Sequence, residues 1–404
     1  MAFGSSAFGQ TAIYLSGAPA TRAIWNQAIY NTLVAKSTGA PAITKYWSGG
    51  TTTTGYNTAN QIVLTGGNLN GTPVTIYGSW TGSTGGNQSV AINPPASNAA
   101  LKVKYLDLAL LTAAGGGYTL GSTNQQYSQV NLSDSLQATL PFNGTIGLTS
   151  PSTSYVTLTE ATTHSPAITG FQFVTNNGAP AGLNNITTNL AQALFTGTGT
   201  PLALFTGSSA DQGTFVYPVG RDIGSGARYI LLAETGIGTA NNSSLIQFTP
   251  TLSGTTITDI VDNPAAGGTI NLITFPLGNG GYPSFSTVQS VLQATSTPAV
   301  GYVVSYVTDT DAATVIAAGA HALNWNGVPY SVAAIQQGQY TFWSYLHVYY
   351  NNTSSYIQNN FPLSKSFADF LAADLAVDTN DGAILSSSLK VVRTLDGGQV
   401  SPNY

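Results

Sequence analysis

The sequence predicts an α/β protein built from two lobes. The chain has 404 residues, which is too long for one ordinary core and about right for two. Hydrophobic residues make up 42% of it, so cores can form and bulk disorder is excluded. Short apolar runs alternate along the chain with segments whose apolar residues recur at helical spacing.

The first part of the chain illustrates this alternation. Residues 11–15 form an apolar run that predicts a strand, and residues 16–21 form a tight loop. Helical spacing then joins a set of apolar residues: Ala23, Ile24, Ala28, Ile29 and Leu33. The alternating stretches 61–65 and 73–77 predict two further strands.

The same reading extends to the end of the chain. Apolar or alternating runs predict strands at 170–174, 215–219, 300–306 and 346–350. Helical spacing predicts helices near 190–194, 229–234, 283–292, 312–320 and 366–375. The aromatic residues Tyr340, Phe342, Trp343 and Tyr345 are expected to pack in a core or between the lobes.

Composition excludes several classes of function. Only 6% of residues are charged, and ten scattered Lys and Arg leave no basic stripe for nucleic acid. No apolar window is long enough to span a membrane. The absence of cysteine excludes disulfides, thiol catalysis and cysteine-based zinc sites. His164, His321 and His347 lack zinc-enzyme spacing, although distant histidines can meet in space. We therefore predict no cofactor.

A low-charge surface rich in Ser, Thr, Asn and Gly favours a secreted protein, periplasmic or extracellular. Residues 1–10 lack the basic and apolar regions of a signal peptide. We interpret them as the tail of a removed signal or a linker. A natural cytosolic start is the alternative.

Three loops share one physical design. The segments 16–21, 78–86 and 220–226 each follow a predicted strand, are rich in Gly, Ser and Thr, and lead toward a helix. Such a loop offers backbone N–H groups, hydroxyl donors and the positive end of a helix dipole, which together suit an oxyanion. Each loop alone is a weak signal in a chain with 45 glycines.

The third loop carries an additional signal, because two of the four arginines, Arg221 and Arg228, lie in or beside it. A guanidinium group is the natural bidentate partner of a phosphate or carboxylate. The alternative is a structural ion pair with Asp222 or Glu234.

Six elements in this order resemble one known family. They are Gly17-Ala-Pro-Ala-Thr21, Gly82-Ser-Thr-Gly-Gly86, Leu132-Ser-Asp-Ser135, Arg221-Asp-Ile-Gly-Ser-Gly-Ala227, Pro298-Ala-Val-Gly-Tyr302 and Gly338-Gln-Tyr-Thr-Phe-Trp343. Together they resemble the PstS-like phosphate-binding proteins, members of the type II periplasmic substrate-binding proteins. The match covers nearly the whole length, although no single element is specific.

The resemblance implies two α/β lobes joined by crossing strands, which close like a hinge around phosphate or a similar oxyanion. It places the first lobe at 1–170, with β-rich insertions at 43–77 and 96–165. The second lobe would span 171–339, and the chain would return to the first at 340–404. An ABC transporter is the partner that the family implies.

Carried over position by position, the resemblance gives six ligand-binding residues. Thr21, Ser83 and Asp134 would face the ligand from the first lobe, and Arg221, Ser225 and Gly226 from the second. Asp134 would accept the hydroxyl of hydrogen phosphate, which sulfate lacks at neutral pH. Its alternative is a surface aspartate that caps a helix.

Three positions depart from the family pattern. Ile223 replaces an aspartate, with Asp222 beside it, and Ala227 replaces a threonine that would donate a hydroxyl. Arg22 replaces an aromatic residue and adds a cation near the expected cleft. These departures allow a larger or different anion.

Two other functions compete with oxyanion binding. The low charge and the long insertions are compatible with a surface-layer or filament-forming protein whose cleft is lost or repurposed, and self-assembly would then replace a transporter partner. A secreted hydrolase is disfavoured, because Gly224-Ser-Gly226 lacks the spacing of a nucleophile elbow. Asp309 and Asp311 are interpreted as turn acids. We therefore predict no enzyme activity.

Overall fold

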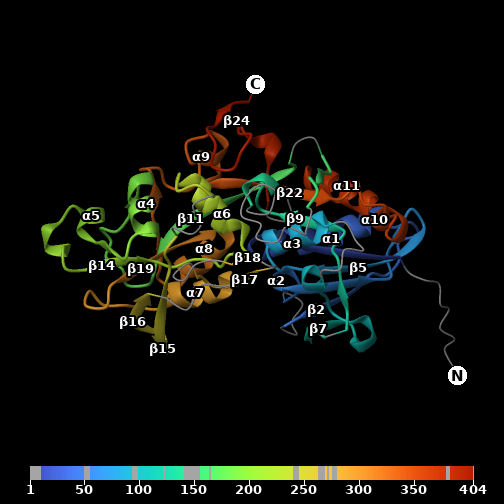
Figure 1. Cartoon of the computed structure of the whole chain (residues 1–404), viewed down its shortest axis with the longest axis horizontal. Helices are drawn as coiled ribbons and strands as arrows, with labels where there is room; N and C mark the ends of the chain where they lie inside the picture. Colours follow the sequence, from blue (N-terminus) through green and yellow to red (C-terminus); the bar gives the residue numbers. More distant parts are fainter. Residues whose placement is uncertain are drawn as a thin grey trace.

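The computed structural model describes residues 11–49, 55–92, 99–121, 123–140, 155–162, 165–239, 245–262, 269–270, 273–274, 280–378 and 383–403. The predicted segment 1–10, His164 and parts of the predicted insertion 96–165 lie outside these residues. Two α/β lobes lie on either side of a pair of crossing strands (Figure 1). The predicted fold class is confirmed.

One mixed sheet runs through both lobes. Its strands follow the order β13 (Thr200–Pro201), β14 (Phe215–Pro218), β19 (Tyr302–Thr308), β11 (Ala167–Thr175), β22 (Trp343–Tyr350), β9 (Val130–Ser133), β1 (Thr11–Gly17), β5 (Thr72–Ser79), β3 (Gln61–Thr65), β2 (Thr44–Ser48) and β7 (Gly115–Tyr118). Short strands join it at the sides: β4 (Asn68–Leu69), β10 (Thr159–Glu160), β20 (His321–Ala322) and β23 (Ile384–Leu385). The segment 43–77 thus supplies strands of the main sheet.

Within the described ranges, five two-stranded ladders stand apart from this sheet. They pair β6 (Val103–Lys104) with β8 (Gln125–Gln126), β12 (Asn185–Ile186) with β21 (Asn324–Trp325), β15 (Phe248–Ser253) with β16 (Thr256–Asp262), β17 (Thr269–Ile270) with β18 (Ile273–Thr274), and β24 (Val391–Val392) with β25 (Ser401–Pro402).

The helices of the described residues cover the two lobes. They are α1 (Arg22–Lys36), α2 (Gly55–Thr58), α3 (Ser83–Ala91), α4 (Thr188–Thr196), α5 (Ala203–Thr206), α6 (Gly226–Glu234), α7 (Phe285–Gln293), α8 (Asp309–Ala317), α9 (Val332–Gln336), α10 (Ser355–Asn360) and α11 (Ser364–Leu375). Among them, no helix is both long and apolar enough to cross a bilayer.

Strands β11 and β22 link two hydrophobic cores. They pair antiparallel, with Ala167 opposite Leu346 and Gly170 opposite Trp343. Ala167 and Leu346 belong to the core of the first lobe, whereas Trp343 belongs to the core of the second. Each crossing strand therefore passes from one core into the other within a few residues.

The predicted return segment 340–404 divides between the two cores. Leu346, Phe367 and Leu371 pack in the first lobe, whereas Ile384 and Leu389 pack in the second. Tyr340, Phe342 and Trp343 are fully buried in the second core, in agreement with the expectation from their aromatic side chains.

The strand directions bring several loops together. β1 runs parallel to both β5 and β9, and β14 runs parallel to β19. The chain leaves β1 toward α1, β5 toward α3 and β19 toward α8, so each of these helices begins at the carboxyl end of a strand. The carboxyl ends of parallel strands are where open α/β sheets present ligand-binding loops.

Candidate functional site

A buried seam forms where the start of α3 meets the end of β9. Ser83, the first residue of α3, donates a hydrogen bond from its Oγ to Oδ1 of Asp134 over 2.6 Å. The backbone N–H of Asp134 donates back to Ser83 Oγ over 3.3 Å. Asp134 is only 1% exposed, so its interpretation as a surface capping residue is wrong. The structure brings these two predicted site residues into direct contact.

The second lobe reaches this seam through the start of α6. A Cβ atom placed on Gly226 would lie 1.9 Å from Asp134 Oδ1 and 2.7 Å from Ser83 Oγ. Side chains do not tolerate such distances, so the close approach of α6 to Asp134 requires glycine at this position. Gly226 therefore joins Ser83 and Asp134 across the two lobes.

A second glycine contact lies beside the first. Gly82 has a φ of +110°, and a Cβ atom there would lie 2.2 Å from the carbonyl oxygen of Gly224. The same carbonyl oxygen accepts the N–H of Thr84 over 3.4 Å. The loop 220–226 thus rests on the first turn of α3, and the lobes are closed against each other here.

Arg221 is buried beside the seam and does not point into open solvent, being 1% exposed. Its Nε donates to the carbonyl oxygen of Tyr282 over 3.0 Å, and its Nη2 to that of Pro283 over 2.9 Å. The guanidinium carbon lies 4.5 Å from the ring centre of Phe285. The third nitrogen, Nη1, is buried without a hydrogen-bond partner among the described residues.

Arg228 holds the backbone of the loop 220–226 in place through hydrogen bonds. Its Nη1 donates to the carbonyl oxygen of Arg221 over 3.0 Å and to that of Gly280 over 2.8 Å. Glu234 forms its buried ion pair with Arg393, at 3.0 Å, rather than with either arginine of the loop. Asp222 accepts the N–H of Gly224 over 3.1 Å. The two arginines therefore differ in role, and Arg228 fixes the backbone that carries Arg221.

The charge state of Asp134 follows from its surroundings. Burial raises the pKa of this carboxyl to about 6, while the bond from Ser83 and the nearby charge of Arg221 act in the opposite direction. The carboxylate of Asp396 raises the pKa of Asp134 a little further. A carboxyl that titrates close to neutrality can either accept or donate a hydrogen bond.

Two other predicted residues stand at helix starts. Thr21 precedes α1 and is 2% exposed, and its Oγ1 has no hydrogen-bond partner among the described residues. Ser225 precedes α6, and its side chain does not cap that helix. Thr84 Oγ1, in the first turn of α3, is also buried and unpartnered in the described part of the chain.

A small cavity that the sequence did not indicate lies next to Thr21. It has a volume of about 50 Å³ and is lined from the first lobe by Thr21 and Arg22 and from the second by residues 308–311. Asp309 and Asp311 thus lie at the boundary between the lobes, and their place in the first turn of α8 corrects their interpretation as turn acids. Burial raises the pKa of the Asp311 carboxyl, and the nearby charge of Arg22 acts in the opposite direction.

The sequence around these two acids predicted the local helix start but not their position between the lobes. Thr308 and Asp311 form a helix start of the Thr-x-x-Asp kind, in which Thr308 Oγ1 accepts the N–H of Asp311 and donates to its carboxylate over 2.9 Å. That pattern predicts the beginning of α8. It contains no information on which residues of the other lobe face it.

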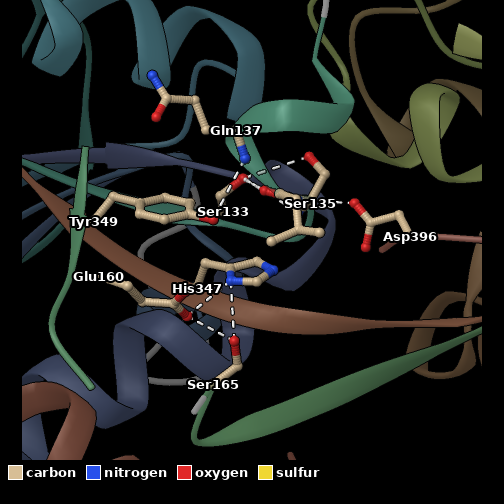
Figure 2. A network of polar contacts seen from close by, with 9 residues as sticks. Ser133, Ser135, Gln137, Glu160, Ser165, His347, Tyr349 and Asp396 are labelled. Atoms are coloured by element: carbon tan, nitrogen blue, oxygen red, sulfur yellow. Dashed lines mark hydrogen bonds and ion pairs between the residues drawn. The ribbon is translucent and has the colours of Figure 1, made fainter. Parts of the chain in front are cut away.

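A second polar cluster surrounds His347 on the crossing strand β22. Figure 2 shows Glu160 and Ser165 approaching the same edge of the imidazole ring. His347 Nδ1 lies 2.8 Å from Glu160 Oε1 and 3.0 Å from Ser165 Oγ, and Ser165 donates to Glu160 over 2.6 Å. Tyr349 stacks on the ring at 5.2 Å.

This cluster combines a serine, a histidine and an acid, but its geometry differs from that of a catalytic triad. A triad needs the serine on one ring nitrogen and the acid on the other. Here both contact Nδ1, and His347 Nε2 is buried with no partner among the described residues. The arrangement does not prepare Ser165 for nucleophilic attack.

The chain is similar to several solved structures. One, from Clostridium perfringens, is described as a phosphate ABC transporter substrate-binding protein with bound phosphate; it shares 15% identity, with a TM-score of 0.46, over 93% of this chain and 99% of that one. An ABC-type phosphate transport receptor from Vibrio cholerae shares 12% identity, with a TM-score of 0.43, over 92% and 99%. PstS from Borrelia burgdorferi shares 12% identity, with a TM-score of 0.36, over 90% and 97%.

No model of a known protein family matches the chain, and no curated protein matches it. The chain is thus similar to phosphate-binding proteins of known structure along nearly its whole length, at low sequence identity.

Proposed function

We propose that this protein binds a small oxyanion of the phosphate class at the seam between its two lobes. The observation that supports this most is a set of buried polar atoms without partners among the described residues: Thr21 Oγ1, Thr84 Oγ1 and Arg221 Nη1. They come from both lobes, and each belongs to or borders one of the three glycine-rich loops. Buried donors without partners are costly, and an oxyanion would supply acceptors for them.

Electrostatics favour an anion at this position. The guanidinium of Arg221 supplies a positive charge, and α3 and α6 both begin at the seam, where helix dipoles are positive. Ser225 adds a hydroxyl that is not used to cap its own helix. The second arginine and the backbone carbonyls around it hold Arg221 in place before any ligand arrives.

Asp134 would make the proposed site selective for phosphate over sulfate. A carboxylate beside an anion is repulsive unless the two share a proton. Hydrogen phosphate carries such a proton at neutral pH and sulfate does not. Asp134, with a pKa of about 6, would accept the phosphate hydroxyl and would repel sulfate.

In the cell, such a protein would act as a secreted receptor that delivers its ligand to an ABC transporter. The crossing strands β11 and β22 would serve as the hinge, since they connect the two cores. Opening would separate the loop 220–226 from α3 and admit the ligand. Closure would then bury the ligand between the lobes. No catalytic step is part of this proposal.

Calorimetric titration tests the proposal directly. We expect phosphate to bind with measurable heat and sulfate to bind at least about tenfold more weakly, because sulfate cannot share a proton with Asp134. Arg221→Ala should weaken phosphate binding by about a hundredfold, since it removes a positive charge and a charge-assisted hydrogen-bond donor. Lys365→Ala, an exposed change on α11, is the matched control.

Because Gly224 and Gly226 contact the first lobe directly, an absence of phosphate binding can also be interpreted. If the folded protein shows no heat with phosphate up to millimolar concentration, the seam is a permanent contact between the lobes. The surface-layer or filament reading would then take its place, and electron microscopy of the purified protein would test for ordered arrays.

A further inference from the structure

The cavity beside Thr21 differs chemically from the seam. It is closed from the first lobe by Thr21, Arg22 and Thr58, from the crossing strand β11 by Thr169, and from the second lobe by Asp309 and Asp311. Its charged lining thus consists of one guanidinium and two carboxylates. A bare oxyanion would be repelled by this surplus of negative charge.

The cavity adjoins the proposed oxyanion site. Thr21, whose buried Oγ1 has no partner among the described residues, lines it directly. Burial raises the pKa of both Asp134 and Asp311, and the charge of Arg221 acts against that rise in both, so this cation lies within electrostatic range of the seam and of the cavity. A ligand held by Arg221 at the seam would be able to extend into the cavity beside Thr21.

The carboxylates are held in place and remain uncompensated by a direct ion pair. Asp311 accepts hydrogen bonds from Thr308 Oγ1 and from Gln289 Nε2, and Asp309 accepts one from Tyr330 Oη over 3.0 Å. The guanidinium of Arg22 donates to the backbone carbonyls of Thr58 and Pro19. The ion pairs found in the described residues do not include one between Arg22 and either acid.

Size limits what the cavity can hold. A volume of about 50 Å³ accommodates about three water-sized groups. A chain of two carbons ending in an ammonium group has three non-hydrogen atoms. Hydroxyls of the threonines would contact the carbons and the linking oxygen, and the carboxylates would receive the ammonium.

We propose that the ligand is a phosphoryl compound with a short substituent ending in an ammonium group, of the aminoethyl phosphate class, and that Asp309 and Asp311 select this substituent. The inference rests on the proposed oxyanion site, which would hold the phosphoryl end. Burial raises the pKa of both carboxyls, and a cation placed between them would favour their ionised forms.

The test compares three probes by calorimetry: inorganic phosphate, ethyl phosphate and aminoethyl phosphate. We expect aminoethyl phosphate to bind about tenfold more tightly than ethyl phosphate, because only the former offers charged hydrogen bonds to the carboxylates. Asp311→Asn should remove this preference, so that the ratio of the affinities for aminoethyl phosphate and ethyl phosphate falls to about one. Asp369→Asn, on the exposed face of α11, should leave the preference intact.

A variant that fails to fold is recognised by its circular dichroism and thermal unfolding. Asp311 also supports the start of α8, so Asp309→Asn provides a second variant whose side chain contacts Tyr330 instead. Loss of the preference in either folded variant supports the inference. An unchanged preference in both folded variants would overturn it.

The outcomes separate the two proposals. Binding of inorganic phosphate with no preference for aminoethyl phosphate would overturn this inference and leave the oxyanion site intact. Binding of aminoethyl phosphate alone would support the inference and reject inorganic phosphate as the ligand. Binding of none of the three probes by the folded protein would reject both.

Discussion

Two serine–carboxylate hydrogen bonds of equal length lie near the same end of one strand pairing, that of β9 with β22. Ser83 donates to Asp134 over 2.6 Å at the end of β9, and Ser165 donates to Glu160 over 2.6 Å beside β22. Ser133, next to Asp134, lies opposite His347 in the antiparallel pairing of β9 with β22. Figure 2 shows how near Ser133 and Ser135 lie to the His347 cluster.

The two clusters differ in how their charges are compensated. His347 and Glu160 contact each other at 2.8 Å, so the acid of this cluster has its partner within the same lobe. The ion pairs of the described residues include none with Asp134; Arg221 affects its pKa from the other lobe, and Gly226 closes over it. A serine–carboxylate hydrogen bond can therefore belong to a structural contact that is complete within one lobe, or to a site in which a ligand would supply the missing partner.

The largest expected effect on this difference comes from Gly226→Ala. The added methyl group would lie 1.9 Å from Asp134 Oδ1, so the lobes cannot close as they do here. Overpacking of this kind costs about 1–3 kcal/mol, and phosphate binding should fall by about ten- to a hundredfold. Calorimetry measures the affinity, and small-angle scattering with phosphate measures whether the molecule still compacts.

Gly213→Ala is the matched control, because a Cβ atom at that position would meet no atom within 4 Å. We expect it to bind phosphate and to compact as the unchanged protein does. Equal affinities for the two variants would contradict the closed seam as the binding state.

Asp134→Asn probes the charge state of the seam. The pKa of Asp134 is raised in the folded protein from 3.8 to about 6, so between these pH values the folded state binds more protons than the unfolded state. Stability contributed by this group is present below pH 4 and is lost as the pH rises through 6. At pH 7 the loss is on the order of 2–3 kcal/mol.

The asparagine variant cannot titrate at this position. Its free energy of unfolding, relative to the unchanged protein, should therefore rise by that amount between pH 4 and pH 7. Denaturant unfolding across this range measures it, and the comparison cancels the contributions of Asp222, Asp309 and Asp311, whose pKa values burial also raises. If the free energies of unfolding of the two proteins changed with pH in parallel, the pKa of Asp134 would not be raised in the folded protein. Sulfate should bind the variant nearly as well as phosphate.

The sequence predicted the features of the seam that depend on local chemistry. A glycine-rich loop after a strand predicts a helix beyond it, and α3 and α6 do follow the predicted loops 78–86 and 220–226, although they begin at Ser83 and Gly226, inside those loops. The close approach of Gly226 to Asp134 is a long-range contact, and only the family resemblance suggested it. The structure places Ser83, Asp134 and Gly226 together, as that resemblance implied.

Features that depend on how distant segments pack were not predictable. Glu160 and His347 are 187 positions apart, and neither has a neighbouring motif that indicates the other. Glu234 was considered as a partner for the arginines of the loop, yet Arg393 from the end of the chain reaches it. Asp311 carried a clear helix-start pattern, but its position opposite Arg22 follows from the closure of the lobes.

The smallest expected effect, and the closest test of the comparison, is the pair Ser83→Ala and Ser165→Ala. Each change removes one hydroxyl that donates to a carboxylate oxygen over 2.6 Å. Each should lower the free energy of unfolding by about 1.5–3 kcal/mol, the usual value for a hydrogen bond to a charged group. On stability alone the two variants should therefore resemble each other.

Ligand binding should separate them. Ser83 lies in the first turn of α3 at the proposed oxyanion site, so Ser83→Ala should weaken phosphate binding by about tenfold. Ser165 hydrogen-bonds with Glu160 and His347 in the described part of the chain, away from the proposed site, so Ser165→Ala should change the affinity by less than about twofold. If calorimetry found equal losses of affinity in both variants, the two clusters would be energetically coupled through the β9–β22 pairing, and the distinction between a finished contact and a ligand site would not hold.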